Sequence, residues 1–130
     1  MECRDYDVVN GSAGLLFSQR VELAEQFYTH LFEALPQVKP LFKSNFSKQK
    51  EMFTVMLAAC VRSLSNEREL QKMCEGLRAA HASYNLSEIE IEITSQSLLK
   101  ALKEVLGDSF DTELQQAWER TIVRLMRAMV

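Results

Sequence analysis

The sequence predicts an all-α fold, and three observations support this prediction. Apolar residues recur at steps of three and four along most of the chain, which is the spacing of one helix face. Only four glycines and two prolines occur in 130 residues, too few for the turns of an all-β fold. No hairpin turn signal joins two alternating runs. We therefore expect a single helical domain over residues 1–130, with helices packed ridge into groove around one core.

The first half of the chain is expected to form three longer helices and a short one. A weak apolar stripe predicts a helix over residues 5–17, and a broad apolar face predicts a helix over 20–35. Pro36 ends the second helix, because proline disfavours the helical conformation of the residue before it. A short turn or helix over 37–42 and a helix over 45–64 complete this half.

A helix over residues 69–86 carries His81 on its apolar face. Ser65 and Asn66 can cap the start of this helix, and Asn85 is expected to end it in a left-handed conformation. An imidazole on a buried stripe must be hydrogen-bonded, charged and paired, or bound to a metal. The helix alone therefore leaves a core histidine and a metal ligand both open. The other histidine, His30, is expected at the surface.

The last third of the chain is expected to form two helices. Ser87 and Glu90 have the spacing of a capping box, which marks a helix start. The run IEIEI at 89–93 alternates like a strand, but helical spacing continues after it and no partner strand is near. We therefore expect a helix that Gly107 ends. Asp111 caps a final helix, which is still apolar where the sequence stops.

Composition narrows the possible functions. A formal net charge of -3 provides no basic field for binding nucleic acid. No apolar run is long enough to cross a membrane, and the acidic, polar N-terminus does not resemble a signal peptide. Three cysteines, an odd number without metal-ligand spacing, indicate a reducing, cytoplasmic setting. Cys60 and Cys74 lie on apolar helix faces and are expected to be core residues.

Three runs of the sequence resemble the globin superfamily. FYTHLFEALPQVKPLF at 27–42 is similar to the B and C helices of single-domain bacterial haemoglobins and of the globin part of flavohaemoglobins. LRAAHASYNL at 77–86 resembles the stretch with the proximal histidine, and LLKALKEVLGDSFDTELQQAW at 98–118 resembles the G helix, turn and start of the H helix. The resemblance implies a globin fold, a three-over-three helical sandwich, with a shortened C–E connection and haem b as cofactor.

The resemblance also implies roles for single residues. A haem is a large apolar disc whose iron needs an axial ligand, and His81 matches the proximal histidine. Tyr28 matches the distal tyrosine that donates to bound oxygen, and Phe42 matches the phenylalanine that stacks on the haem. Met52 matches the apolar residue over the iron, and Leu86 matches an apolar wall residue. Tyr28 and Met52 would look the same in sequence if they were ordinary core residues.

Lys48 departs from the family pattern. It matches the distal position of the E helix, where the family commonly has glutamine and animal globins have histidine. A lysine there can extend to solvent or to a haem propionate, donate to a bound ligand, or bind the iron when neutral; we favour the first. If the register is shifted by one residue, Gln49 takes the distal position.

The proximal side departs from the flavohaemoglobin pattern too. Ile91 stands where those globins have a tyrosine, and the matching glutamate would fall beyond Val130. The second ring nitrogen of His81 is therefore expected to bond a backbone carbonyl, which gives a neutral imidazole. A neutral proximal histidine is typical of oxygen carriers and sensors in this superfamily.

The expected function is reversible binding of O2, CO or NO by a b-type haem protein that is not an enzyme by itself. The apolar end at Val130 favours a globin domain of a longer sensor, with a homodimer contact or a C-terminal signalling output domain. An NO dioxygenase that depends on an external reductase is the alternative, since no flavin or nicotinamide domain is expected here. A globin fold without haem is a third possibility.

Overall fold

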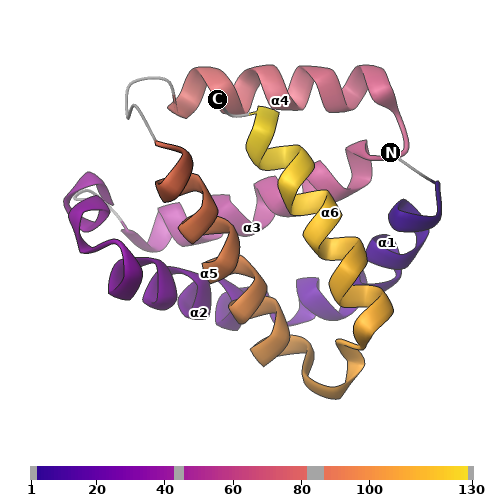
Figure 1. The fold of residues 1–130 in the computed structure, drawn as a ribbon, viewed down its shortest axis with the longest axis horizontal. Coiled ribbons are helices and arrows are strands. Elements are labelled where there is room, and N and C mark those ends of the chain that lie inside the picture. Colours follow the sequence, from indigo (N-terminus) through magenta and orange to yellow (C-terminus); the bar gives the residue numbers. More distant parts are fainter. Residues whose placement is uncertain (1–2, 43–45, 82–86, 129–130) are drawn as a thin grey trace.

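The computed structural model describes residues 3–42, 46–81 and 87–128. Within these ranges the chain forms six α-helices and two short 3-10 helices, so the all-α prediction is confirmed (Figure 1). None of the described helices is both long enough and apolar enough to span a membrane. The elements in chain order are α1 (Cys3–Ser18), α2 (Arg20–Ala34), η1 (Pro36–Phe42), α3 (Phe46–Ser63), α4 (Glu67–His81), α5 (Glu88–Leu106), η3 (Gly107–Ser109) and α6 (Thr112–Ala128).

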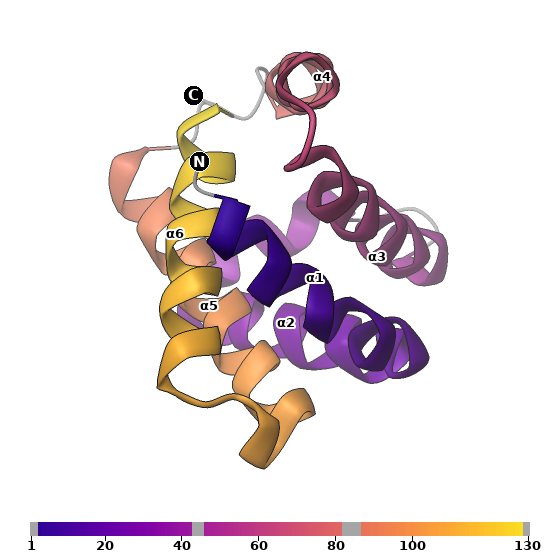
Figure 2. The ribbon, with the colours of Figure 1, turned by 90° about the vertical axis from the view of Figure 1, so that its right-hand side faces the viewer.

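The helices cross one another in layers. α2 and α5 make the most extensive helix–helix contact, α1 packs against α6 and α3, and α4 packs against α3 and α6. Figure 1 shows α4 along one edge of the molecule with α3 next to it, while α2 and α5 cross below. Figure 2 shows α4 end-on, with α3 on one side and α5 and α6 on the other. The arrangement leaves α3 between α4 and the pair α1 and α2.

The helix starts confirm three expected caps. The side-chain oxygen of Asn66 accepts hydrogen bonds from the first turn of α4, including the Glu69 N–H at 3.2 Å. Ser87 and Glu90 form the full capping box, with bonds of 3.1 and 3.0 Å. Asp111 accepts the first-turn N–H of α6 at 2.9 Å. The strand-like alternation after Glu90 is therefore helical in the folded protein.

One of two expected helix ends is confirmed, and the other stays a prediction. Gly107 ends α5 with a φ of 54°, in the left-handed region that costs glycine little. Asn85, the expected end of the helix that carries His81, lies outside the described residues. α4 is described as far as His81.

The core is centred where α6 meets α1 and α5. Trp118 is fully buried, and its indole N–H donates to the Ser12 hydroxyl at 3.2 Å. Ser12 in turn donates to the Val9 carbonyl at 2.7 Å, so this polar chain inside the core is hydrogen-bonded throughout. Every buried side-chain nitrogen or oxygen in the described part of the chain has a partner. The largest fully buried side chains are Trp118, Leu102, Ile122, Val9 and Thr121.

Three apolar residues of the predicted helices are exposed rather than buried. Leu15, Val21 and Met52 are 40%, 67% and 51% exposed, respectively. At 100° per residue each lies about 90° or more from the centre of the buried face of its helix. Periodicity predicts where a buried face is centred but not how wide it is, so residues at its edge are predicted poorly.

Candidate functional site

Tyr28 lies in a cluster of aromatic side chains between α2 and α3. Its side chain is only 5% exposed, and its ring contacts Phe46 and Phe53 edge-on at centroid distances of 5.2 and 5.7 Å. Phe27 stacks on Phe53 at 4.6 Å, which joins the two helices. The cluster therefore holds the Tyr28 ring at a defined place. We call these residues the aromatic cluster: Phe27, Tyr28, Phe32, Phe46 and Phe53.

Gln49 is the polar partner of Tyr28. The Gln49 amide nitrogen donates to the Tyr28 hydroxyl oxygen at 3.5 Å, across the boundary between α2 and α3. Burial raises the pKa of the Tyr28 phenol above 10.0, and the bond from Gln49 opposes that rise. The phenol therefore keeps its proton at neutral pH and can act as a hydrogen-bond donor inside an otherwise apolar wall.

The residues one position earlier on α3 point elsewhere. Lys48 is exposed and Met52 is 51% exposed, whereas Gln49 and Phe53 are half-buried and contact Tyr28. This burial favours the register shifted by one residue, with Gln49 at the distal position. Assignments of Lys48 and Met52 to the site stay predictions.

The sequence pattern assigns neither Phe53 nor Lys50 to the site, although it predicts that Phe53 faces the core. Phe53 lies one turn after Gln49, and the two have the same spacing as Lys48 and Met52, so only burial distinguishes the registers. The Lys50 ammonium lies 5.1 Å from the centre of the Phe46 ring and 3.9 Å from the Glu25 carboxylate. Lys50 thus covers the solvent side of the aromatic cluster.

Three expected site residues are described only in part or not at all. His81 is the last residue of α4, and Phe42 is the last residue of η1, but their side chains are not among those described. Leu86 lies outside the described residues. Figure 1 shows the C-terminal end of α4 on the same side of the molecule as the N-terminal ends of α3 and α5.

Apolar side chains from four helices are partly exposed although they pack against the core. They are Phe32 on α2, Phe53 on α3, Leu77 on α4 and Ile93 on α5. A flat apolar group with one polar ligand contact buries aromatic and aliphatic side chains of this kind. Together with the buried Tyr28 hydroxyl, these residues fit a haem.

Three other titratable side chains, His30, Cys60 and Cys74, lie outside the aromatic cluster. His30 lies at the surface as expected, partly covered by Glu104, with which it pairs, and this pair joins α2 to α5. Burial, with a further contribution from nearby Cys74, raises the pKa of the Cys60 thiol to about 11. Burial also raises the pKa of the Cys74 thiol, so both stay protonated at neutral pH and react slowly. No group of three or more potential ligands for a bare metal ion occurs in the described part of the chain.

Comparison with known proteins identifies the family. The globin family model matches residues 25–129, and the chain belongs to the globin family. Globin membership implies haem binding. The recognised resemblance and the expected globin fold are thereby confirmed.

Curated relatives come from bacteria and from a plant. The flavohemoprotein of Rhizobium meliloti is 26% identical over 115 residues, covering 86% of this chain and 28% of that protein. An anaerobic nitrite reductase of Gossypium hirsutum is 24% identical over 123 residues, covering 83% of this chain and 76% of that protein. The chain therefore spans less than a third of the length of the flavohemoproteins that it matches.

Solved structures agree with the fold. An engineered carbene transferase, described as a nitric oxide dioxygenase from Rhodothermus marinus, has a TM-score of 0.87 at 25% identity and covers 99% of this chain and 90% of its own. A bacterial globin from Campylobacter jejuni has a TM-score of 0.83 at 20% identity, covering 98% of this chain and 93% of its own.

The hydrogen bond from Gln49 predicts the direction of one pKa change. Replacing Gln49→Leu should raise the pKa of Tyr28 further, because the lost bond stabilises the phenolate more than the phenol. An alkaline titration followed by the NMR signal of the tyrosine ring carbon bonded to oxygen measures this pKa. Glu51→Leu, a change of similar size at an exposed position of the same helix, is the control. An unchanged Tyr28 pKa in the Gln49 variant would contradict the assigned contact.

Proposed function

We propose that the chain binds haem b through His81 and holds a diatomic gas, chiefly O2, beside Tyr28. The observation that carries this proposal is the buried Tyr28 hydroxyl with Gln49 as its polar neighbour, inside an aromatic wall. Haem, which His81 would hold, would supply an iron that binds a diatomic gas. CO and NO are expected to bind at the same place.

Tyr28 and Gln49 act as a donor pair. The phenol of Tyr28 donates a hydrogen bond to the gas. This hydrogen bond is strongest for the ligand that carries the most negative charge. The amide of Gln49 supports the phenol oxygen and limits its rotation. The aromatic cluster excludes water from this donor pair, which strengthens the hydrogen bond to the gas.

The proximal side is proposed from the position of His81 at the end of α4. Phe42 and Leu86 are proposed as apolar walls of the same pocket, and Ile91, which is half-buried, offers no hydrogen bond to His81. A neutral imidazole of this kind suits reversible gas binding. The protein would work in the cytoplasm as an oxygen-binding protein or as the gas-sensing part of a longer chain, with a homodimer contact or an output domain.

Lys48 and Met52 keep a peripheral part in this proposal. Both are exposed, so Lys48 is proposed to reach a haem propionate at the edge of the pocket, and Met52 to line the rim.

The first experiment is an absorption spectrum of the purified protein in its ferric and reduced states and after addition of O2 or CO. We expect a strong Soret band that shifts with each gas, and we expect His81→Ala to lose the haem or the normal ferrous spectrum. His30→Ala, which changes the other histidine, should keep the spectrum because His30 pairs with Glu104. A protein that takes up no haem, or a His81→Ala variant with an unchanged spectrum, would disprove the proposal.

O2 dissociation rates distinguish the contributions of Tyr28, Gln49 and Lys48. Tyr28→Phe should speed O2 release by roughly ten- to a hundredfold, because a hydrogen bond to a charged partner contributes about 1.5–3 kcal/mol. Gln49→Leu should also speed release, whereas Lys48→Leu should change the rate by less than about threefold. Stopped-flow replacement of O2 by CO gives these rates. A larger effect of Lys48→Leu than of Gln49→Leu would contradict the shifted register and favour Lys48 at the distal position.

The name of the similar structure from Rhodothermus marinus favours a second candidate function, NO dioxygenation. In this reaction one NO, one O2 and one electron yield one nitrate, so turnover needs a reductase as electron donor. With the oxygenated protein in excess, one nitrate per NO is expected. Repeated turnover is expected only when a flavin-dependent reductase is added. A reductase that reduces the protein without sustaining NO consumption would leave gas binding as the function.

A further inference from the structure

Lys50 connects the start of α3 to α2 at the solvent side of the aromatic cluster. Its ammonium lies 3.9 Å from the Glu25 carboxylate of α2 and 5.1 Å from the centre of the Phe46 ring. The ammonium is attracted to both the carboxylate and the ring face. The Lys50 side chain is 28% exposed and the Glu25 side chain 58%, so water screens the ion pair in part and each contact alone is modest.

The contacts of Lys50 are compatible with one rotation of α3 about its axis. Consecutive residues of an α-helix lie about 100° apart, so Lys48 and Lys50 are displaced from Gln49 by this angle in opposite directions. Gln49 donates to the Tyr28 hydroxyl at 3.5 Å. A turn of α3 that brought Lys48 to Tyr28 would carry Lys50 away from Glu25. The ion pair therefore favours Gln49 over Lys48 beside Tyr28.

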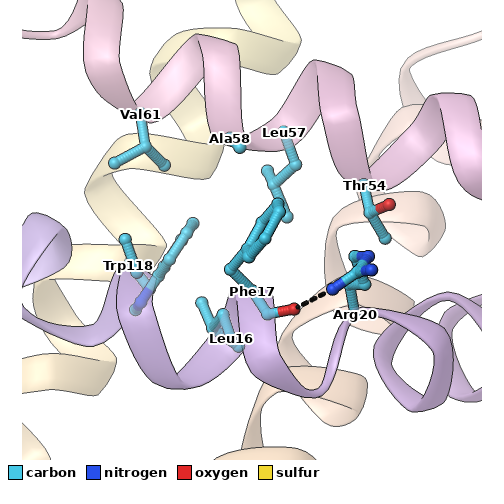
Figure 3. Close-up of a pocket in the computed structure, with 9 residues that line it drawn as sticks. Leu16, Phe17, Arg20, Thr54, Leu57, Ala58, Val61 and Trp118 are labelled. Atoms are coloured by element: carbon cyan, nitrogen blue, oxygen red, sulfur yellow. Dashed lines mark hydrogen bonds between the residues drawn. The ribbon is translucent and has the colours of Figure 1, made fainter.

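The packing of α3 farther along leaves room for such a turn. A cavity of about 30 Å³ beside Trp118, partly open to solvent, lies between α1, α3 and α6. Figure 3 shows Leu57, Ala58 and Val61 of α3 at this cavity, with Leu16 of α1 and Trp118 of α6 on its other sides. Side chains that leave a cavity between them restrict a helix less than close packing does. Contacts nearer the start of α3 therefore contribute more to fixing its rotation.

The hydrogen bond from Gln49 is sensitive to a small turn of α3. Its length of 3.5 Å is beyond the usual range of about 2.7–3.2 Å for such bonds, so little further separation breaks it. Gln49 comes directly before Lys50 in the chain. A contact that holds the Lys50 ammonium on α2 thus also limits the movement of the backbone from which Gln49 extends.

We propose that Lys50 is a positioning residue for the gas site beside Tyr28. Its ammonium fixes the rotation of α3 that keeps Gln49 at the Tyr28 hydroxyl. A phenol held in one orientation favours the gas that carries more negative charge when bound, so Lys50 would set the preference for O2 over CO. This effect on gas binding rests on the proposed function. The effect on the contact between Tyr28 and Gln49 can be tested whether or not the protein takes up haem.

The contact itself is measured by the nuclear Overhauser effect (NOE) between the Gln49 side-chain amide and the Tyr28 ring at neutral pH. Lys50→Met keeps the length of the side chain without its charge and should lose this NOE, whereas Lys50→Arg keeps a cation and should retain it. Lys72→Met makes the same change at an exposed position of α4 and should leave the NOE unchanged. The spectra are recorded on the diamagnetic CO-bound protein, or on the purified protein if it takes up no haem.

Release rates of O2 and CO distinguish positioning from a general loosening of the pocket. Lys50→Met and Glu25→Leu should each speed O2 release by roughly two- to fivefold, the range expected for a partly exposed ion pair, and should change CO release by less. Because the two variants remove one contact, the double variant should release O2 no faster than either single variant. Stopped-flow mixing gives all of these rates.

The ring contact between Phe27 and Phe53 reports whether α2 and α3 stay packed in each variant. Glu25→Leu, which changes a more exposed residue, carries the test if Lys50→Met loses that contact. Persistence of the Gln49 NOE in Lys50→Met, or its loss in Lys50→Arg as well, would overturn the proposal. Equal acceleration of O2 and CO release would also overturn it. A protein without haem would refute the proposed function, while the NOE would still decide whether Lys50 positions Gln49.

Discussion

The stack of Phe27 on Phe53 is the contact on which the candidate site depends. It joins α2 to α3. It also fixes the position of Tyr28, because the Tyr28 ring packs against the same Phe53. α2 is held in turn by its extensive contact with α5 and by the His30–Glu104 pair. The contacts among these three helices thereby position the Tyr28 hydroxyl. The wall around it is mainly aromatic, which raises the cost of leaving a polar group there unpaired.

Much of the fold could be predicted from the sequence because its signals are local. Asn66, Ser87 and Asp111 mark helix starts through hydrogen bonds within four residues, and these caps form as expected. The run at 89–93 shows the limit of periodicity, since its alternation resembles a strand until the capping box before it is considered. The exposure of Val21 depends on which helices pack nearby. The periodicity of the sequence carries no information about those neighbours.

The site could be predicted less completely than the fold. Tyr28 is buried with a polar partner, but the choice between Lys48 and Gln49 depends on the rotation of α3. Lys48 and Met52 have the same spacing as Gln49 and Phe53, so the sequence pattern fits both registers. The cavity beside Trp118 has no sequence signal at all, because it results from side-chain volumes that fail to fill the space between three helices.

α3 borders both the aromatic cluster and the cavity, and this has a consequence for how the protein can evolve. Only a strip of exposed positions, such as Glu51 and Val55, can accept substitutions at little cost in folding. A helix moves nearly as a rigid body, so a larger side chain on the cavity face would also displace Gln49 and Phe53. Mutations on the two faces should therefore accumulate as compensating pairs, and lineages that change one face are expected to change the other.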